Sequence, residues 1–119
     1  MRSLPLSLVR RLVPLRGMSE NSLPALLEQS ECPLIGSGRV LFTALDNARF
    51  YFYLLSGEAE IRCATGSVIH TAEHLFPMGY GLRDLQTVIA RTDCVYLKIE
   101  RSALDRQLCW DHVASAIEL

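Results

Sequence analysis

The chain has 119 residues, of which half are apolar and 21% are charged. This length is enough for one domain with a sizeable core but too short for two independent domains. Twelve Lys and Arg against thirteen Asp and Glu leave a formal net charge of −1, so no basic field attracts nucleic acid, and we expect the chain alone not to bind it.

The first residues are not expected to act as a secretion signal or a membrane span. Residues 1–17 are apolar and basic, but Arg10 and Arg11 interrupt them before an uncharged core of signal-peptide length forms. The apolar run is also too short to cross a bilayer. We therefore expect a soluble, cytoplasmic protein with no membrane partner.

The cysteines are spaced too widely for a zinc or redox motif. No Cys-x-x-Cys pair occurs, and we expect reduced, mostly buried thiols. The four residues are Cys32, Cys63, Cys94 and Cys109.

The start of the chain is predicted to be helical. Apolar residues between Leu8 and Leu15 recur at helical spacing, and Pro14 ends the segment. The oxygen side chains of residues 19–22 suit an N-cap for a second short helix before Cys32. Helices over about residues 5–30 followed by strands are an α+β order.

Residues 49–62, RFYFYLLSGEAEIR, are predicted to form two strands. A nearly continuous apolar run stops at Ser56 and Gly57 and then restarts with alternating polarity. Such a run is typical of a strand buried within a sandwich or barrel. Closely spaced turn residues across about residues 34–99 favour a jelly-roll-like barrel over a parallel α/β sheet.

The chain ends in a predicted amphipathic helix. The last two strands, at 87–90 and 95–99, are joined by a polar bend at 91–93. Ser102 suits the N-cap of a helix over about residues 102–117, and we expect Cys109 to face the core. Apolar residues gather in this helix, which predicts a symmetric homodimer through it. They are Leu108, Cys109, Trp110, Val113 and Ile117.

The predicted fold class is therefore mainly β (α+β). It is a jelly-roll-like, double-stranded β-helix barrel with short N-terminal helices and one C-terminal helix. We expect residues 1–119 to form a single domain.

Several motifs resemble the cyclic-nucleotide-binding domain of the catabolite-activator superfamily, which has a cupin-type β-barrel. GRVLF at 38–42, Asp46, YLLSG at 53–57 and TVIARTDC at 87–94 match its strand starts, acidic turn and closing strand. Leu45 departs from the pattern, since the family's turn usually carries glycine. No helix-turn-helix follows residue 108, so the resemblance implies a regulatory domain and not a complete transcription factor.

The family's phosphate cassette is degenerate in this sequence. The resemblance implies a glutamate on the ribose hydroxyl and an arginine on the cyclic phosphate. An ungapped count back from Thr87 puts Asp84 at the arginine position and Arg83 at the proline before it. The same count puts His74 and Leu75 at the glycine and glutamate positions. A one-residue shift would instead bring Arg83 to the phosphate.

These five residues form the predicted, altered ligand-binding segment. With both charged partners of the nucleotide replaced, the resemblance implies a regulatory or sensor module that does not bind cAMP or cGMP in the usual way. We expect it not to be an enzyme and to need no cofactor. The resemblance leaves open a small-molecule ligand of another kind.

A second function also stays open, a small cupin-like metalloenzyme using His70 and His74. The two histidines share strand parity and lie beside Glu73. Cupins, however, bind metal through His-x-His, a following Glu and a distant His. No His-x-His occurs here, and His112 falls in the terminal helix, so we expect no metal site.

Overall fold

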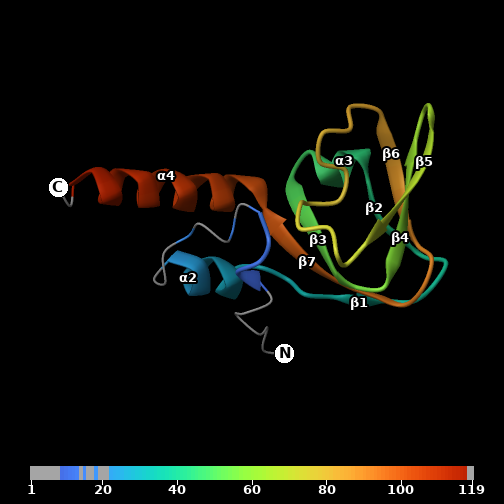
Figure 1. Cartoon of the computed structure of the whole chain (residues 1–119), viewed down its shortest axis with the longest axis horizontal. Helices are drawn as coiled ribbons and strands as arrows, with labels where there is room; N and C mark the ends of the chain where they lie inside the picture. The colour runs from blue at the N-terminus through green and yellow to red at the C-terminus, as the bar shows by residue number, and fades with distance from the viewer. Residues whose placement is uncertain (1–8, 14, 16–17, 19–21, 118–119) are drawn as a thin grey trace.

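The fold consists of two antiparallel sheets, with helices before and after them in the chain. The computed structural model describes residues 9–13, 15, 18 and 22–117, and it describes side chains up to residue 109. One sheet has the order β1-β7-β3 and the other β2-β6-β4-β5. Figure 1 shows the two sheets facing each other. The predicted fold class is confirmed. The strands are β1 (Leu34–Ile35), β2 (Val40–Thr43), β3 (Phe50–Ser56), β4 (Glu58–Cys63), β5 (Gly66–Thr71), β6 (Leu85–Ala90) and β7 (Cys94–Glu100).

The space between the sheets holds the first of two apolar cores. Phe42 of β2 and Phe52 of β3 stack across it, with ring centroids 3.9 Å apart and planes within 3°. Each fully buried side chain of this size contributes about 1.5–3 kcal/mol. The core consists of Leu41, Phe42, Phe52, Leu54, Ala59, Ile61, Met78, Leu85, Val88, Ala90, Cys94 and Tyr96.

The second core lies on the other face of β3 and β7. Tyr53 and Leu97 are paired in register across these strands, and both are fully buried beneath the helices. Because successive side chains of a strand point to opposite faces, Phe52 enters the first core and Tyr53 the second. Burial on both faces explains the continuous apolar run in β3. This core consists of Val9, Leu12, Leu15, Met18, Leu23, Leu26, Tyr53, Leu97, Ile99, Ala103 and Leu104.

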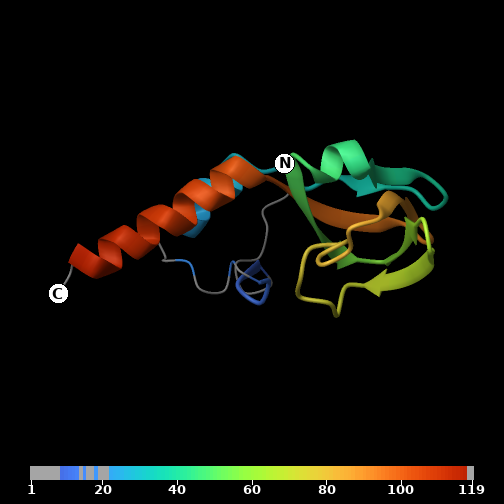
Figure 2. The same ribbon diagram turned by 90° about the horizontal axis from the view of Figure 1, so that it is seen from above.

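The described helices are α2 (Ser22–Glu28), α3 (Ala44–Asn47) and α4 (Arg101–Ile117). Val9 is helical and buried, while residues 5–8 of the predicted first helix lie outside the described residues. Helix α4 follows β7 directly and runs away from the barrel, with α2 beside its first part (Figures 1 and 2).

Among the α4 side chains that the structure describes, those of the first two turns pack into the second core. Ala103 and Leu104 are buried and Leu108 is half-buried, but Cys109 is exposed. The expectation that Cys109 faces the core is wrong. Each residue of an α-helix advances by about 100°. Cys109 therefore points well away from the side that carries Leu104 and Leu108. No disulfide joins the four cysteines.

The turn predicted at Asp46 is a single helical turn, α3. The Asp46 carboxylate accepts hydrogen bonds from the Thr43 amide at 3.0 Å and from the Thr43 hydroxyl at 3.2 Å, which fixes the start of this turn. Leu45 is 83% exposed, and none of the described non-glycine residues has a positive φ. A side chain therefore fits where the family usually has glycine.

Gly57→Ala is expected to destabilise the protein much more than Gly38→Ala. Both glycines have similar positive φ values, 93° and 85°, which cost an alanine about 1–2 kcal/mol. A Cβ at Gly38 has no neighbour within 4 Å, whereas one at Gly57 would strike the Asp93 carbonyl oxygen and lie 2.9 Å from Cys94 Sγ. This overlap adds about 1–3 kcal/mol. Urea unfolding of both variants measures the difference, and equal losses would contradict the packing at Gly57.

Candidate functional site

Residues 72–84 connect β5 to β6 at the place of the family's phosphate cassette. None of them is helical. Backbone hydrogen bonds fix the segment at three points along its length. The Met78 amide donates to the Phe52 carbonyl at 2.7 Å, and the carbonyls of Leu75 and Asp84 accept from Val13 at 2.8 Å and Ala64 at 3.2 Å. The segment is therefore held against β3, the N-terminal region and the β4–β5 turn.

Leu75 takes part in a bridge that reaches the second core. Its carbonyl binds the Val13 amide, and the Val13 carbonyl accepts a hydrogen bond from the Tyr53 hydroxyl at 2.7 Å. Burial raises the pKa of Tyr53 well above its usual range, so this hydroxyl stays a donor. The Leu75 side chain offers no acceptor for a ribose hydroxyl.

His74 serves the turn that leaves β5. The Thr71 amide donates to His74 Nδ1 at 3.2 Å, and the His74 amide donates to the Thr71 carbonyl at 3.1 Å. The exposed imidazole therefore closes a local turn, at the position that the ungapped count assigns to the family's glycine.

Asp84 is bound within the β4–β5 turn. Its carboxylate accepts hydrogen bonds from the Thr65 hydroxyl at 2.8 Å and the Thr65 amide at 3.3 Å. The Thr65 hydroxyl lowers the pKa of Asp84, because it binds the ionised form. Asp84, which the ungapped count from Thr87 sets at the arginine position, therefore carries a negative charge that these bonds stabilise.

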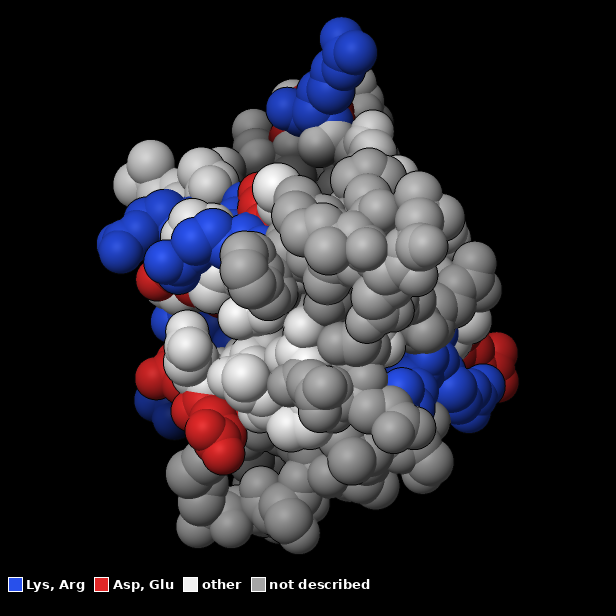
Figure 3. Space-filling model, turned by 90° about the vertical axis from the view of Figure 1, so that its left-hand side faces the viewer, with Lys and Arg blue, Asp and Glu red and all other residues white. Residues whose placement is uncertain are grey.

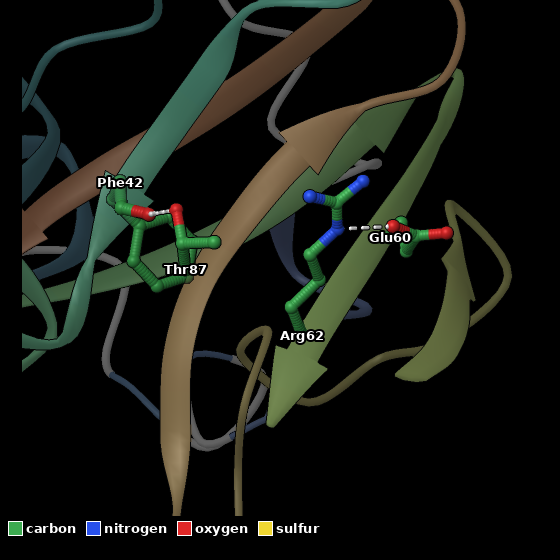
Figure 4. A network of polar contacts seen from close by, with 4 residues as sticks. All are labelled: Phe42, Glu60, Arg62 and Thr87. Carbon is green, nitrogen blue, oxygen red and sulfur yellow. Dashed lines mark hydrogen bonds and ion pairs between the residues drawn. The ribbon is translucent and has the colours of Figure 1, made fainter. Parts of the chain in front are cut away.

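Thr87 is directed toward a neighbouring strand. Figure 4 shows its hydroxyl pointing to the Phe42 carbonyl, which accepts at 3.4 Å. Its partner in register on β4, Arg62, forms an ion pair with Glu60 at 2.6 Å. Thr87 and Arg62 are thus both engaged in contacts within the sheet.

A pocket of about 450 Å³ opens where the 72–84 segment meets the start of α4. Of the five residues predicted from the sequence, only Arg83 lines it. His74, Leu75, Asp84 and Thr87 do not. The lining residues are Asn47, Tyr51, Pro77, Met78, Gly79, Tyr80, Gly81, Leu82, Arg83 and Arg101.

Arg101 is the pocket residue that the sequence analysis missed. Its Nε donates to the Asn47 carbonyl at 2.7 Å, and Nη2 donates to Asn47 Oδ1 at 3.3 Å. The guanidinium also lies over the Tyr51 ring, 4.2 Å from its centroid. These partners are 54 and 50 residues away in sequence, so no local pattern could have predicted the contact.

Solved structures resemble this chain, although no protein-family model and no curated protein sequence matches it. The sensor domain of the transcriptional regulator DNR from Pseudomonas aeruginosa is 19% identical, with a TM-score of 0.70 over 87% of this chain and 80% of that one. A cyclic nucleotide-binding-like protein from Brucella abortus is 16% identical, with a TM-score of 0.63 over 87% and 96%.

The regulatory domain of Toxoplasma gondii PKA, crystallised with cAMP, is 14% identical, with a TM-score of 0.65 over 85% of this chain and 42% of that one. The chain spans 52% of DNR itself. It has the cyclic-nucleotide-binding fold. The resemblance drawn from residues 38–42, 53–57 and 87–94 is confirmed for the fold.

Within this fold, His70 is a buried polar group without a partner. Its side chain is 8% exposed, and Nε2 has no hydrogen-bond partner among the described residues. The His74 ring lies 4.7 Å away, centroid to centroid. Burial, followed by the charge of His74, lowers the pKa of His70 to about 4. His70 is therefore neutral at pH 7.

The cupin-like alternative depends on further ligands joining His70 and His74. Glu73 is exposed, and no group of three or more His, Cys, Asp or Glu within the described ranges is arranged to hold a metal ion. The side chain of His112 lies outside these ranges.

The described surface shows no large single-sign field on the face in Figure 3. Blue and red side chains lie there in small separate groups, in keeping with the net charge of −1. Among the helices that the structure describes, none is long and apolar enough to span a bilayer.

The stability of the protein is expected to fall as pH decreases from about 6.5 to about 4. The folded pKa of His70 lies below its ordinary value of 6.5, so the unfolded chain binds more protons across this window. Discounted for partial solvent screening, the loss is about 1–2 kcal/mol. Urea unfolding at pH 4.5 and 7 compares the unchanged protein with His70→Leu, in which this part of the loss disappears. An identical pH dependence in both proteins would contradict the buried, neutral imidazole.

Proposed function

We propose that this chain is a non-catalytic regulatory or sensor domain that responds to a small molecule other than cAMP or cGMP. The proposal is supported by the fold, which the sensor domain of DNR and the cAMP-bound regulatory domain of PKA share. The observation that carries it is the hydrogen bond from the Thr65 hydroxyl, which favours the ionised form of Asp84, the residue that the ungapped count sets at the family's arginine position.

The altered segment removes both polar partners of a cyclic nucleotide. A charge-assisted hydrogen bond contributes about 1.5–3 kcal/mol, so losing the arginine and glutamate contacts weakens binding at least about a hundredfold. Asp84 adds repulsion toward a phosphate instead of attraction. Its two bonds to Thr65 oppose any rotation of the carboxylate away from that place.

cAMP and cGMP are expected not to bind with micromolar affinity. Calorimetry with each nucleotide up to millimolar concentration measures this. Micromolar binding would contradict the proposal, and its loss in Arg83→Ala would then show that Arg83 acts one position from where the ungapped count places the arginine.

The proposal that the chain binds another small molecule is tested by thermal unfolding with a panel of small metabolites. A ligand at a hundred times its Kd stabilises the folded state by about 2.7 kcal/mol, which gives a clear shift in Tm. A panel of broad chemical range that leaves Tm unchanged would count against a sensor role.

We also propose that the chain forms a homodimer through α4. The first turns of this helix pack on the chain's own barrel, while its remaining length extends beyond α2 (Figure 1). In the sequence this length carries Trp110, Val113 and Ile117. Aromatic and aliphatic residues such as these are typical of subunit contacts.

Trp110→Glu is expected to convert a dimer into a monomer, because it puts a charge into an apolar contact. Light scattering across a range of protein concentrations measures the mass of both proteins. Arg39→Glu makes a charge reversal at an exposed position outside α4, is the control and should stay dimeric. A monomeric unchanged protein at high concentration would contradict the dimer.

A further inference from the structure

The pocket beside α4 is large enough for a small molecule, and its lining combines polar and apolar residues. Its volume of about 450 Å³ falls within the range of roughly 300–1,000 Å³ that is common for such sites. Pro77, Met78 and Leu82 form the apolar part of the lining. Pro77 and Met78 are buried, so packing restricts their side chains. The pocket draws its walls from α3, β3, the 72–84 segment and the start of α4.

The charges around the pocket are unbalanced. Its lining includes two arginines, Arg83 and Arg101, and no carboxylate. Neither arginine belongs to the ion pairs found among the described residues, which are Arg62 with Glu60 and Lys98 with Glu31. Asp105 is the acidic residue that contacts the lining, since its carboxylate accepts a hydrogen bond from the Tyr51 hydroxyl at 3.4 Å.

Arg101 is already held in position for a ligand. A guanidinium has five N–H donors in a fixed plane, and the two contacts with Asn47 engage Nε and Nη2. The remaining donors have no partner among the described residues. Stacking on Tyr51 limits rotation of the group, so little conformational freedom is lost when an oxyanion binds.

We propose that this pocket binds a small organic anion, a carboxylate or phosphate group joined to a flat apolar body. Arg83 and Arg101 donate to the oxyanion, and the apolar body lies against Pro77, Met78 and Leu82. The site is separate from the degenerate cassette positions at His74, Leu75, Asp84 and Thr87. Because it names the ligand class of a sensor domain, the inference rests on the function proposed above.

Such a ligand would contact the start of α4 directly. Arg101 is the first residue of that helix, and its side chain also fixes the carbonyl at the end of α3. An anion shared between Arg83 and Arg101 therefore ties the 72–84 segment to the helix on which the proposed dimer depends.

Calorimetry with phenyl phosphate and benzoate at constant ionic strength tests the site. Saturable binding of at least one compound is expected, and the tighter of the two identifies the preferred oxyanion. Arg83→Gln should weaken it roughly tenfold or more, as expected for the loss of one charge-assisted hydrogen bond. Arg39→Gln makes the same charge change at an exposed arginine outside the pocket and should leave the affinity unchanged.

Absence of saturable binding, or equal weakening in Arg39→Gln and Arg83→Gln, would overturn the inference. Arg101→Lys keeps the charge but loses the fork that holds Asn47, and it should also weaken binding. If that variant fails to fold, Arg83→Gln still decides the matter. A metabolite that stabilises the unchanged protein and Arg83→Gln equally would support the sensor function but would overturn the proposal that the ligand binds in this pocket.

Discussion

Burial of β3 and β7 on both faces is the constraint on which the rest of the molecule depends. One face closes the barrel through Phe52 and Leu54, and the opposite face presents Tyr53 and Leu97 to the helices. Without α2, α4 and the N-terminal residues, that second face would be an exposed apolar patch. The helices are therefore part of the same folding unit as the barrel, and the Tyr53 hydroxyl extends this unit through Val13 to the 72–84 segment.

The strands could be predicted because their signals are local. The continuous apolar run in β3, the break at Gly57 and the alternation in β4 each lie within a few residues. Cys109 was predicted to face the core and is exposed. The apolar composition of a helix does not determine which of its residues pack on the barrel. Helix α3 replaces an expected turn since the Asp46 carboxylate can bind the Thr43 amide at helical spacing.

The site was predictable only in part, because its decisive contacts join distant parts of the sequence. The cassette positions come from counting along one segment, so the altered chemistry at Leu75 and Asp84 stays a prediction. The partner of Asp84 is Thr65, 19 residues earlier, and it is brought near by the pairing of β4 with β6, in which Cys63 faces Leu85. Arg101 and Asn47 are 54 residues apart and meet only because β3 and β7 are neighbours, so that the residues at their ends lie together.

The arrangement of charge distinguishes this chain from the nucleotide-binding pattern that its fold suggests. The Asp84 carboxylate, which the ungapped count sets at the arginine position, accepts two hydrogen bonds from a threonine of the adjacent turn and keeps its negative charge. The neighbouring Arg83 lines a different pocket, together with an arginine from the helix start. Positive charge is thus found between the 72–84 segment and α4, where no lining carboxylate offsets it. Electrostatic attraction in a partly enclosed site is stronger than on open surface, because fewer water molecules screen it. An anion bound at this junction would therefore contact the first residue of α4, so its effect on the helix would not have to be transmitted through the interior of the barrel.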